Sequence, residues 1–321
     1  MIGAVVIGRN EGARLLRCLD SLAGQTGHIV YVDSGSTDGS VAAAQARGVE
    51  VVTLDLSQPF TAARARNAGL AALRARPERP ELVQFVDGDC EVAAGWIATA
   101  RAFLAANPKA AVACGRRRER FPEASVYNAH CDREWATPIG RARSCGGDAL
   151  MRMAALDQVG GYDPRLIAGE EPEMCVRLRA QGWEIWRLDA EMTLHDAAMT
   201  RFGQFWKRAR RAGHAYAEGA HLHGRPPERH GVAQQRRALI WGLALPLVIV
   251  AAALLVSPLA LLALAIYPAQ VARLARRGGG TRAAWHSAAL LTVSKFAEAL
   301  GCAEFHLRRL AGRPAGLIEY K

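Results

Sequence analysis

Asp87 and Asp89, two carboxylates separated by a single glycine, are the residues of this sequence that most directly suggest a chemical role. They follow the apolar run of residues 82–86, which has the composition of a buried strand, so both are expected where the chain leaves a sheet at its carboxyl edge. Two acidic groups there can hold one hard cation, and Mg²⁺ or Mn²⁺ commonly joins protein carboxylates to substrate phosphates. The alternative is a solvated turn, because Asp and Gly dominate turns.

Short apolar runs alternate with helical patterns through the first 120 residues, and this alternation predicts the architecture around the two carboxylates. Strands that alternate with helices imply a mainly parallel α/β sheet flanked by helices. Ligands of such sheets lie beyond the carboxyl ends of the strands. Strands are expected at residues 4–7, 28–32, 49–54, 82–86 and 110–114, with helices at 15–22, 41–47, 61–74 and 95–106 between them.

Polar loops follow three of these strands. Asn10 and Glu11 come after the first strand, and Asp33 comes after the second. Together with Asp87 and Asp89 they are expected to open on one edge of the sheet. The sequence contains neither GxGxxG nor GxxxxGK[ST], so the usual dinucleotide and P-loop sites are not supported.

The second half of the sequence is less regular. Acidic residues near position 171 suit the first turn of a helix, because they complement the helix dipole. His195 follows the last predicted strand. The expected elements are a glycine-containing loop at 144–148, a helix at 151–159, an acidic helix start at 169–173, a strand at 183–188 and a basic, aromatic helix at 200–218.

Seven segments of the chain carry a family resemblance through their joint order and spacing, although each alone is weak evidence. They are VVIGRNEG, YVDSGSTDGS, ARARNAGL, FVDGDC, CGGDALMR, VGGYDPRL and GEEPEMCVRLRAQGW. In these segments the chain resembles a family 2 glycosyltransferase with a GT-A fold, of the membrane-associated bacterial type. The resemblance covers about residues 1–200.

The resemblance implies a substrate-binding set at the sheet edge. Asp33 would hydrogen-bond the nucleotide base, and Arg66 would lie near the base or the diphosphate. Gly147 has the simpler alternative of serving a tight turn, as does its neighbour Gly146. The complete implied set is Asn10, Glu11, Asp33, Arg66, Asp87 and Gly147.

The resemblance also implies a metal site for Mg²⁺ or Mn²⁺. Asp87 and Asp89 would be its metal-binding pair, with Asp89 preferred as the direct ligand. His195 stands where related enzymes place a later metal-contacting histidine. The alternative for His195 is a structural histidine at the end of a strand.

The proposed catalytic base is the least regular part of the match. Glu171 falls at the family's base position, but the usual Glu-Asp pair is here Glu170-Glu171. Because Glu is one methylene longer than Asp, the base could be Glu171, Glu170 or even Glu173. The alternative is a charge cluster at a helix N-terminus.

The implied reaction gives each group a task. A nucleoside diphosphate leaves as a polyanion whose charge a divalent cation neutralises, and a carboxylate takes the proton of the attacking hydroxyl. One base and a single displacement imply inversion. The segment 204–208 replaces the QxxRW motif of processive synthases, which favours transfer of a single sugar. A nucleotidyltransferase and a non-catalytic membrane scaffold with the same fold are the alternatives.

Charge and cysteine content bear on the compartment. The net charge is +11, and residues 201–321 carry 18 Lys and Arg against 5 Asp and Glu, so the basic excess lies in the tail. The seven cysteines include no CxxC pair, which fits a reducing compartment. Cys90 and Cys145 are interpreted as packing residues, because neither has a base motif beside it. No signal peptide is expected at the start.

The tail predicts a membrane association. Residues 238–269 are almost entirely apolar, too long for one span and short for two, with a natural bend at Ser257-Pro258. Arginines on both sides favour a hairpin with both ends cytoplasmic; a single tilted span and a buried helix are the alternatives. Residues 284–310 form a second, amphipathic stretch that suits a membrane interface.

These observations define the expected organisation. A catalytic domain at 1–220 is followed by a basic linker at 221–237 and by the membrane hairpin and amphipathic helices at 238–321. The expected partners are a nucleotide-sugar donor, a lipid-linked or glycan acceptor and the cytoplasmic face of the plasma membrane. Anionic headgroups explain the basic tail, and no nucleic-acid motif is present.

Overall fold

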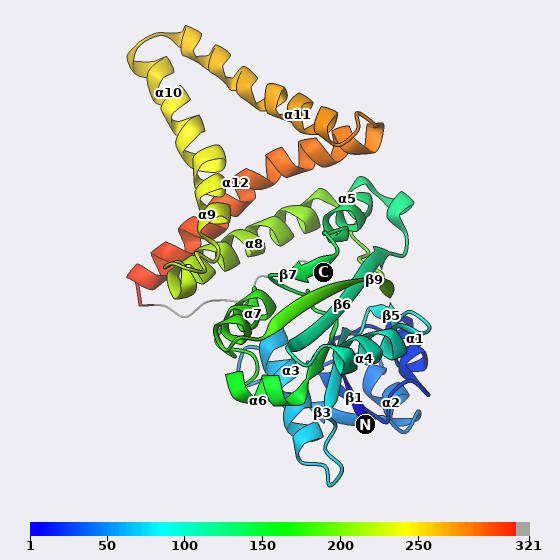
Figure 1. Cartoon of the computed structure of the whole chain (residues 1–321). Helices are drawn as coiled ribbons and strands as arrows, with labels where there is room; N and C mark the ends of the chain where they lie inside the picture. The colour runs from blue at the N-terminus through cyan, green and yellow to red at the C-terminus, as the bar shows by residue number, and fades with distance from the viewer. Residues whose placement is uncertain (313–321) are drawn as a thin grey trace. The chain divides into compact units, whose positions relative to one another are not determined.

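The structure is a computed structural model that describes residues 1–312, so the last nine residues of the predicted tail lie outside the described residues. Contacts divide the chain into two compact units (Figure 1). The first unit comprises Met1–Arg120 and Glu134–Ala197. The second comprises Phe121–Arg133 and the chain from Ala198 onward. Every residue proposed above for catalysis, substrate binding or metal binding lies in the first unit.

The first unit is built on one mixed sheet, in the order β3-β2-β1-β4-β8-β6-β9-β5 with β7 paired to β9. Pairing is parallel through β3, β2, β1 and β4 and between β6 and β9, and it is antiparallel where β8 joins β4 and β6. The predicted α/β class with a mainly parallel sheet is therefore confirmed. The strands are β1 (Ile2–Gly8), β2 (His28–Asp33), β3 (Glu50–Thr53), β4 (Leu82–Asp87), β5 (Cys90–Val92), β6 (Ala110–Glu119), β7 (Gly140–Ala142), β8 (Ala149–Arg152) and β9 (Glu184–His195).

Helices flank this sheet. Helix α3 packs on β1 and β2, and α4 packs on β6 and β9. A Cβ added at Gly69 would lie 2.4 Å from Val5 Cγ1, so glycine is what allows α3 to approach β1 this closely. The close approach fixes Arg66, which lies three residues earlier on the same helix face. The helices of this unit are α1 (Ala13–Leu22), α2 (Ser40–Gln45), α3 (Ala62–Arg74), α4 (Trp96–Ala106), α6 (Met153–Val159) and α7 (Glu170–Ala180).

The structure corrects several predicted boundaries. The helix expected at 151–159 begins only at Met153, because residues 149–152 form β8 between β4 and β6. Buried short apolar runs do not distinguish strand from helix by pattern alone, which accounts for the error. The strand expected at 183–188 continues to His195 as β9. Strands β5 and β7 and helix α5 (Val126–Trp135) were not predicted.

The second unit is helical. Its longest helices, α8 (Phe202–His223) and α12 (Arg282–Leu310), pack with their backbones in direct contact. A Cβ added at Gly213 would lie 2.0 Å from the carbonyl oxygen of Glu298, and one added at Gly301 would lie 2.0 Å from that of Arg210. These two glycines therefore make the close helix contact possible.

Two further helices of this unit are long and apolar enough to cross a membrane. They are Val232–Leu255 and Pro258–Arg277, in which the most apolar stretches of 18 residues have mean hydropathies of 2.6 and 1.4. Ser257 separates them in an extended conformation, as expected for a residue before proline, and at this bend in Figure 1 the chain passes from α10 into the helical segment that continues as α11. Most of their apolar side chains are exposed. Their elements are α9 (Val232–Leu239), η2 (Ile240–Ala244), α10 (Leu245–Leu255), η3 (Pro258–Ala265) and α11 (Ile266–Arg277).

Candidate active site

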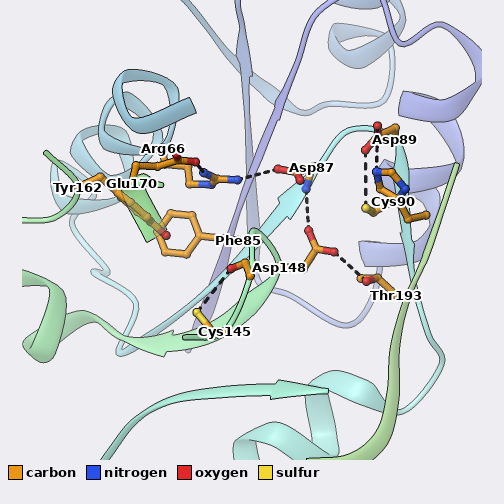
Figure 2. A network of polar contacts seen from close by, with 12 residues as sticks. Arg66, Phe85, Asp87, Asp89, Cys90, Cys145, Asp148, Tyr162, Glu170 and Thr193 are labelled. Atoms are coloured by element: carbon orange, nitrogen blue, oxygen red, sulfur yellow. Dashed lines mark hydrogen bonds and ion pairs between the residues drawn. The ribbon is translucent and has the colours of Figure 1, made fainter. Parts of the chain in front are cut away.

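Asp87, the last residue of β4, is held by a buried arginine. Its Oδ1 accepts a hydrogen bond of 2.8 Å from Arg66 Nη2, and Arg66 Nη1 donates to Glu170 Oε1 at 2.7 Å. The Arg66 side chain is only 3 % exposed. Figure 2 shows the guanidinium lying between the two carboxylates, which come from β4 and from the start of α7. The guanidinium of Arg66 in α3 thus connects β4 and α7.

Gly147 lies against this pair. A Cβ at position 147 would lie 2.8 Å from Asp87 Oδ2 and 2.9 Å from Arg66 Nη2. Its φ angle does not require glycine, so the residue is needed here for space. The structure therefore brings three of the predicted substrate-binding residues, Arg66, Asp87 and Gly147, into direct proximity.

The residue after this glycine, Asp148, was not among the predicted site residues, although it lies in the CGGDALMR segment. It is fully buried, and its Oδ1 accepts a hydrogen bond of 3.1 Å from the backbone N–H of Asp87. Its Oδ2 accepts from Thr193 Oγ1 at 2.7 Å (Figure 2) and from Arg117 Nε at 2.9 Å. An acidic residue directly before a buried apolar strand was the available signal for Asp148.

Arg117 is the second residue that the sequence did not reveal. Besides binding Asp148, its Nη2 lies 3.4 Å from Asp87 Oδ2. Burial acts to lower the pKa of Arg66 and that of Arg117, but the neighbouring carboxylates outweigh it and raise both pKa values above the ordinary value. Both guanidinium groups therefore stay charged beside Asp87, in a place suited to phosphate oxygens.

Asp89 lies beyond Gly88 and faces His195. Its Oδ2 is 3.3 Å from His195 Nε2, and its carbonyl oxygen accepts a hydrogen bond from the backbone N–H of Asp196. The antiparallel pairing of β5 with β9 places Cys90 opposite His195 and so fixes this arrangement. His195 Nδ1 lies 3.5 Å from Glu119 Oε2, and the ring packs edge-on against Trp135.

This second group of residues fits a divalent cation. The ligand atoms of Asp89, Cys90 and His195 lie within 4.8 Å of one another. A carboxylate oxygen suits both Mn²⁺ and Mg²⁺, whereas an imidazole nitrogen is a ligand for transition metals such as Mn²⁺. Burial raises the pKa of the Cys90 thiol well above its ordinary value, so Asp89 and His195 are the better ligands. Asp87, the other predicted metal ligand, contacts Arg66 and Arg117, and one of its oxygens also lies within 4.8 Å of Cys90 Sγ.

The loops after β1 and β2 hold the remaining predicted binding residues. Asn10 Oδ1 accepts from the backbone N–H of Thr37 at 2.7 Å, which joins the two loops. Glu11 pairs with Arg14. Asp33 is buried, and its oxygens accept hydrogen bonds from Tyr31 Oη and from two backbone N–H groups of its own loop. These residues shape the loops at the ends of β1 and β2.

The three acidic candidates for the base have different partners. Glu170 is neutralised by Arg66, and Glu173 is paired with Arg177 one turn later in α7. Glu171 forms no ion pair among residues 1–312. Its Oε1 instead accepts hydrogen bonds from Cys145, through the backbone N–H at 2.6 Å and the thiol at 3.0 Å, and from the Cys175 thiol at 3.0 Å. Three donors therefore fix the orientation of its carboxylate.

The two thiols around Glu171 are protonated at neutral pH. Burial, together with the hydrogen bond to Cys175, raises the pKa of Cys145 well above its ordinary value. The hydrogen bond with Cys145 acts to lower the pKa of Cys175, but burial and the charge of Glu171 outweigh it and raise that pKa to about 11. Cys145, which was interpreted from the sequence as a packing residue, also contacts the carboxylate of Glu171 through its thiol.

The chain is similar in sequence and in fold to known glycosyltransferases. The family model described as "Glycosyl transferase family 2" matches residues 4–155. The structure is similar to mannosyltransferase PcManGT from Pyrobaculum calidifontis, solved with GDP-Man and Mn²⁺, at 20 % identity and a TM-score of 0.65, over 94 % of this chain and 86 % of that one. It is also similar to residues 1–349 of S. aureus TarS at 15 % identity and a TM-score of 0.51, over 97 % of this chain and 92 % of that one.

The fold is the GT-A fold of glycosyltransferases. Within it, the chain carries a glycosyltransferase family 2 domain. The resemblance inferred from the seven sequence segments is therefore confirmed. None of the curated proteins matched the sequence significantly.

Proposed function

We propose that this protein is an inverting glycosyltransferase that moves a single sugar from a nucleotide diphosphate donor to a hydroxyl acceptor. The observation that carries the proposal is the chain of contacts around Asp87. Asp87 contacts Arg66, and Arg66 contacts Glu170 at the start of α7, where Glu171 is the next residue. Asp89, two residues after Asp87 in the sequence, faces His195. The proposed proton acceptor and the proposed cation site thus lie close in sequence to the carboxylates that contact the buried Arg66 and the partly exposed Arg117.

The donor would bind at the carboxyl edge of β1, β2 and β4. Asn10, Glu11 and Asp33 would form the base pocket through the joined loops. Arg66 and Arg117 would turn from Asp87 to the diphosphate oxygens, because phosphate offers the same acceptor geometry as a carboxylate. Asp89 and His195 would hold Mn²⁺ or Mg²⁺, which neutralises charge on the diphosphate.

Glu171 is the proposed base. Its Oε1 is fixed by three hydrogen bonds, so Oε2 is the oxygen left to take the proton of the acceptor hydroxyl. As that proton moves to Glu171, the hydroxyl oxygen bonds to the anomeric carbon and the bond to the diphosphate oxygen breaks. One displacement inverts the anomeric configuration. Glu170 is the second candidate, but its pairing with Arg66 makes it a weaker base.

The organisation proposed for this activity is a catalytic domain at 1–220, a basic linker at 221–237 and a membrane region at 238–321. Arg236 and Arg237 lie in α9, near the start of the first apolar helix, and Arg276 and Arg277 end the second, which suits a hairpin with both ends on the cytoplasmic face of the plasma membrane. That location favours a lipid-linked acceptor in surface polysaccharide or glycolipid synthesis. Flotation of the full chain with anionic but not neutral vesicles would test the basic contribution.

Product analysis tests the reaction. The full chain in detergent is incubated with nucleotide sugars and Mn²⁺; GDP-mannose is a suitable first donor because PcManGT was solved with GDP-Man and Mn²⁺. Release of the nucleoside diphosphate supports sugar transfer, whereas release of pyrophosphate supports a nucleotidyltransferase. Donor turnover that survives unchanged in both Asp89→Ala and Glu171→Gln contradicts the proposed site. If the chain binds a nucleotide sugar but no tested combination of donor and acceptor is turned over, the result supports a non-catalytic scaffold.

A further inference from the structure

Two thiols and a carboxylate converge beside the proposed active site. Cys145 Sγ lies 3.9 Å from Cys175 Sγ, and each sulfur lies 3.0 Å from Glu171 Oε1. Cys175 follows Glu171 by one helical turn in α7, whereas Cys145 comes from the loop between β7 and β8. Their ligand atoms all lie within 4.8 Å of one another.

These distances match a tetrahedral zinc site. A Zn–S bond of about 2.3 Å in tetrahedral geometry places two sulfurs about 3.8 Å apart. The observed sulfur–sulfur distance of 3.9 Å meets this value without rearrangement of either cysteine. The carboxylate oxygen would retreat from the sulfurs by about half an ångström, since the tetrahedral S···O edge is about 3.5 Å.

We propose that Cys145, Cys175 and Glu171 form a binding site for a thiophilic divalent cation such as Zn²⁺, separate from the Asp89–His195 site. Water fills the fourth position. The cation replaces the two thiol protons, which leave to solvent, so binding needs no oxidant or reductant. Cys145 is the partly exposed member of the set and provides the way in for the ion.

The site has a consequence for catalysis that rests on the proposed function. A cation bound between the thiolates takes Glu171 as its third ligand. The positive charge bound at Oε1 then makes Oε2 a weaker acceptor for the proton of the acceptor hydroxyl. Zn²⁺ at this site therefore inhibits sugar transfer even when Mn²⁺ and donor are present in excess.

Cobalt absorption tests the site independently of activity. The full chain, kept reduced, is titrated with Co²⁺, whose thiolate complexes absorb by charge transfer. We expect the charge-transfer band in the unaltered chain and in Asp89→Ala, and its loss in Cys145→Ser and Cys175→Ser. Glu171→Gln keeps the band and weakens Co²⁺ binding by about tenfold or more. Cys302→Ser is the matched control, because Cys302 is a buried cysteine of α12 whose thiol donates a hydrogen bond to the carbonyl oxygen of Gly213.

A second measurement needs no variant. Zn²⁺ should protect Cys145 of the unaltered chain from iodoacetamide, as followed by peptide mass analysis. Absence of the charge-transfer band in a folded chain overturns the site whatever the result of the donor assay, and so does a band that persists when both cysteines are replaced. If the band behaves as expected but Glu171→Gln retains full transferase activity, the proposed base is wrong and the inhibition by Zn²⁺ is not expected.

Discussion

Arg66 of α3 and Asp87 of β4 form a 2.8 Å ion pair in which the guanidinium is almost completely buried. A buried cation is costly unless carboxylates surround it, and Arg66 has Asp87 on one side and Glu170 on the other. The pair therefore stabilises the meeting of α3, β4 and α7. The same contact engages the carboxylate of Asp87, which the resemblance implied as one of the two metal-binding aspartates.

Removal of Asp87 should reveal the free-energy cost of burying the Arg66 guanidinium. We expect Asp87→Ala to lower the free energy of unfolding by about 3 kcal/mol, because among residues 1–312 Arg66 then keeps only Glu170 as an acidic hydrogen-bond partner. Urea unfolding of the full chain in detergent measures it. The control is Asp157→Ala, since Asp157 pairs with Arg74 and Arg79 on the surface and should cost less than about 1 kcal/mol. Equal losses in the two variants would contradict the buried role.

Asp89→Asn should weaken cation binding without unfolding the chain. The amide keeps the shape of the side chain but removes the charge that faces His195, so we expect at least about a tenfold loss of Mn²⁺ affinity. Titration of free Mn²⁺ by electron paramagnetic resonance measures the affinity. Asp20→Asn provides the control, because Asp20 is an exposed partner of Arg47. Unchanged affinity in Asp89→Asn would place the cation elsewhere.

Gly147→Ala should abolish donor turnover through a local clash. The new methyl group would lie within 3 Å of both Asp87 Oδ2 and Arg66 Nη2, and we expect a loss of about 1–3 kcal/mol in stability as the pair shifts. Gly146→Ala separates this effect from backbone strain, because Gly146 has a positive φ but open space around it. Turnover that falls equally in both variants would point to the loop conformation rather than to the clash.

The thiol of Cys175 predicts a pH dependence of stability. Its pKa is raised from the ordinary 9.0 to about 11 in the folded chain, so its contribution is complete below pH 9 and is lost as pH rises through 11. Between pH 8 and pH 10 the loss from this group should be about 1 kcal/mol. Urea unfolding at the two pH values should show a shallower decline in Cys175→Ser. A decline equal to that of the unaltered chain would contradict the burial of this thiol.

Gly301→Ala should separate α12 from α8. The added methyl group would lie 2.0 Å from the carbonyl oxygen of Arg210, and backbone cannot yield as a side chain can. We therefore expect a loss of more than about 3 kcal/mol or no folded second unit. Gly203→Ala, at an open position of α8, should change stability by less than about 1 kcal/mol. Helical content by circular dichroism during heating distinguishes the two.

The sequence by itself determined the parts of the molecule that depend on neighbours in the chain. The apolar run before Asp87 and the alternation of strands and helices were sufficient for the α/β class, because period and burial are local properties. The order of seven short segments was sufficient for the family. The bend at Ser257-Pro258 also followed from local chemistry, since proline restricts the residue before it.

Only the tertiary structure decided which groups meet. Arg66 and Glu170 are 104 residues apart, and no periodicity links them. Asp148 and Arg117 reach Asp87 only because β8 runs antiparallel between β4 and β6, an insertion that a short apolar run does not reveal. The two thiols around Glu171 likewise come together through the packing of a loop on α7. Contacts between distant segments depend on the sheet order, which the sum of local preferences does not encode.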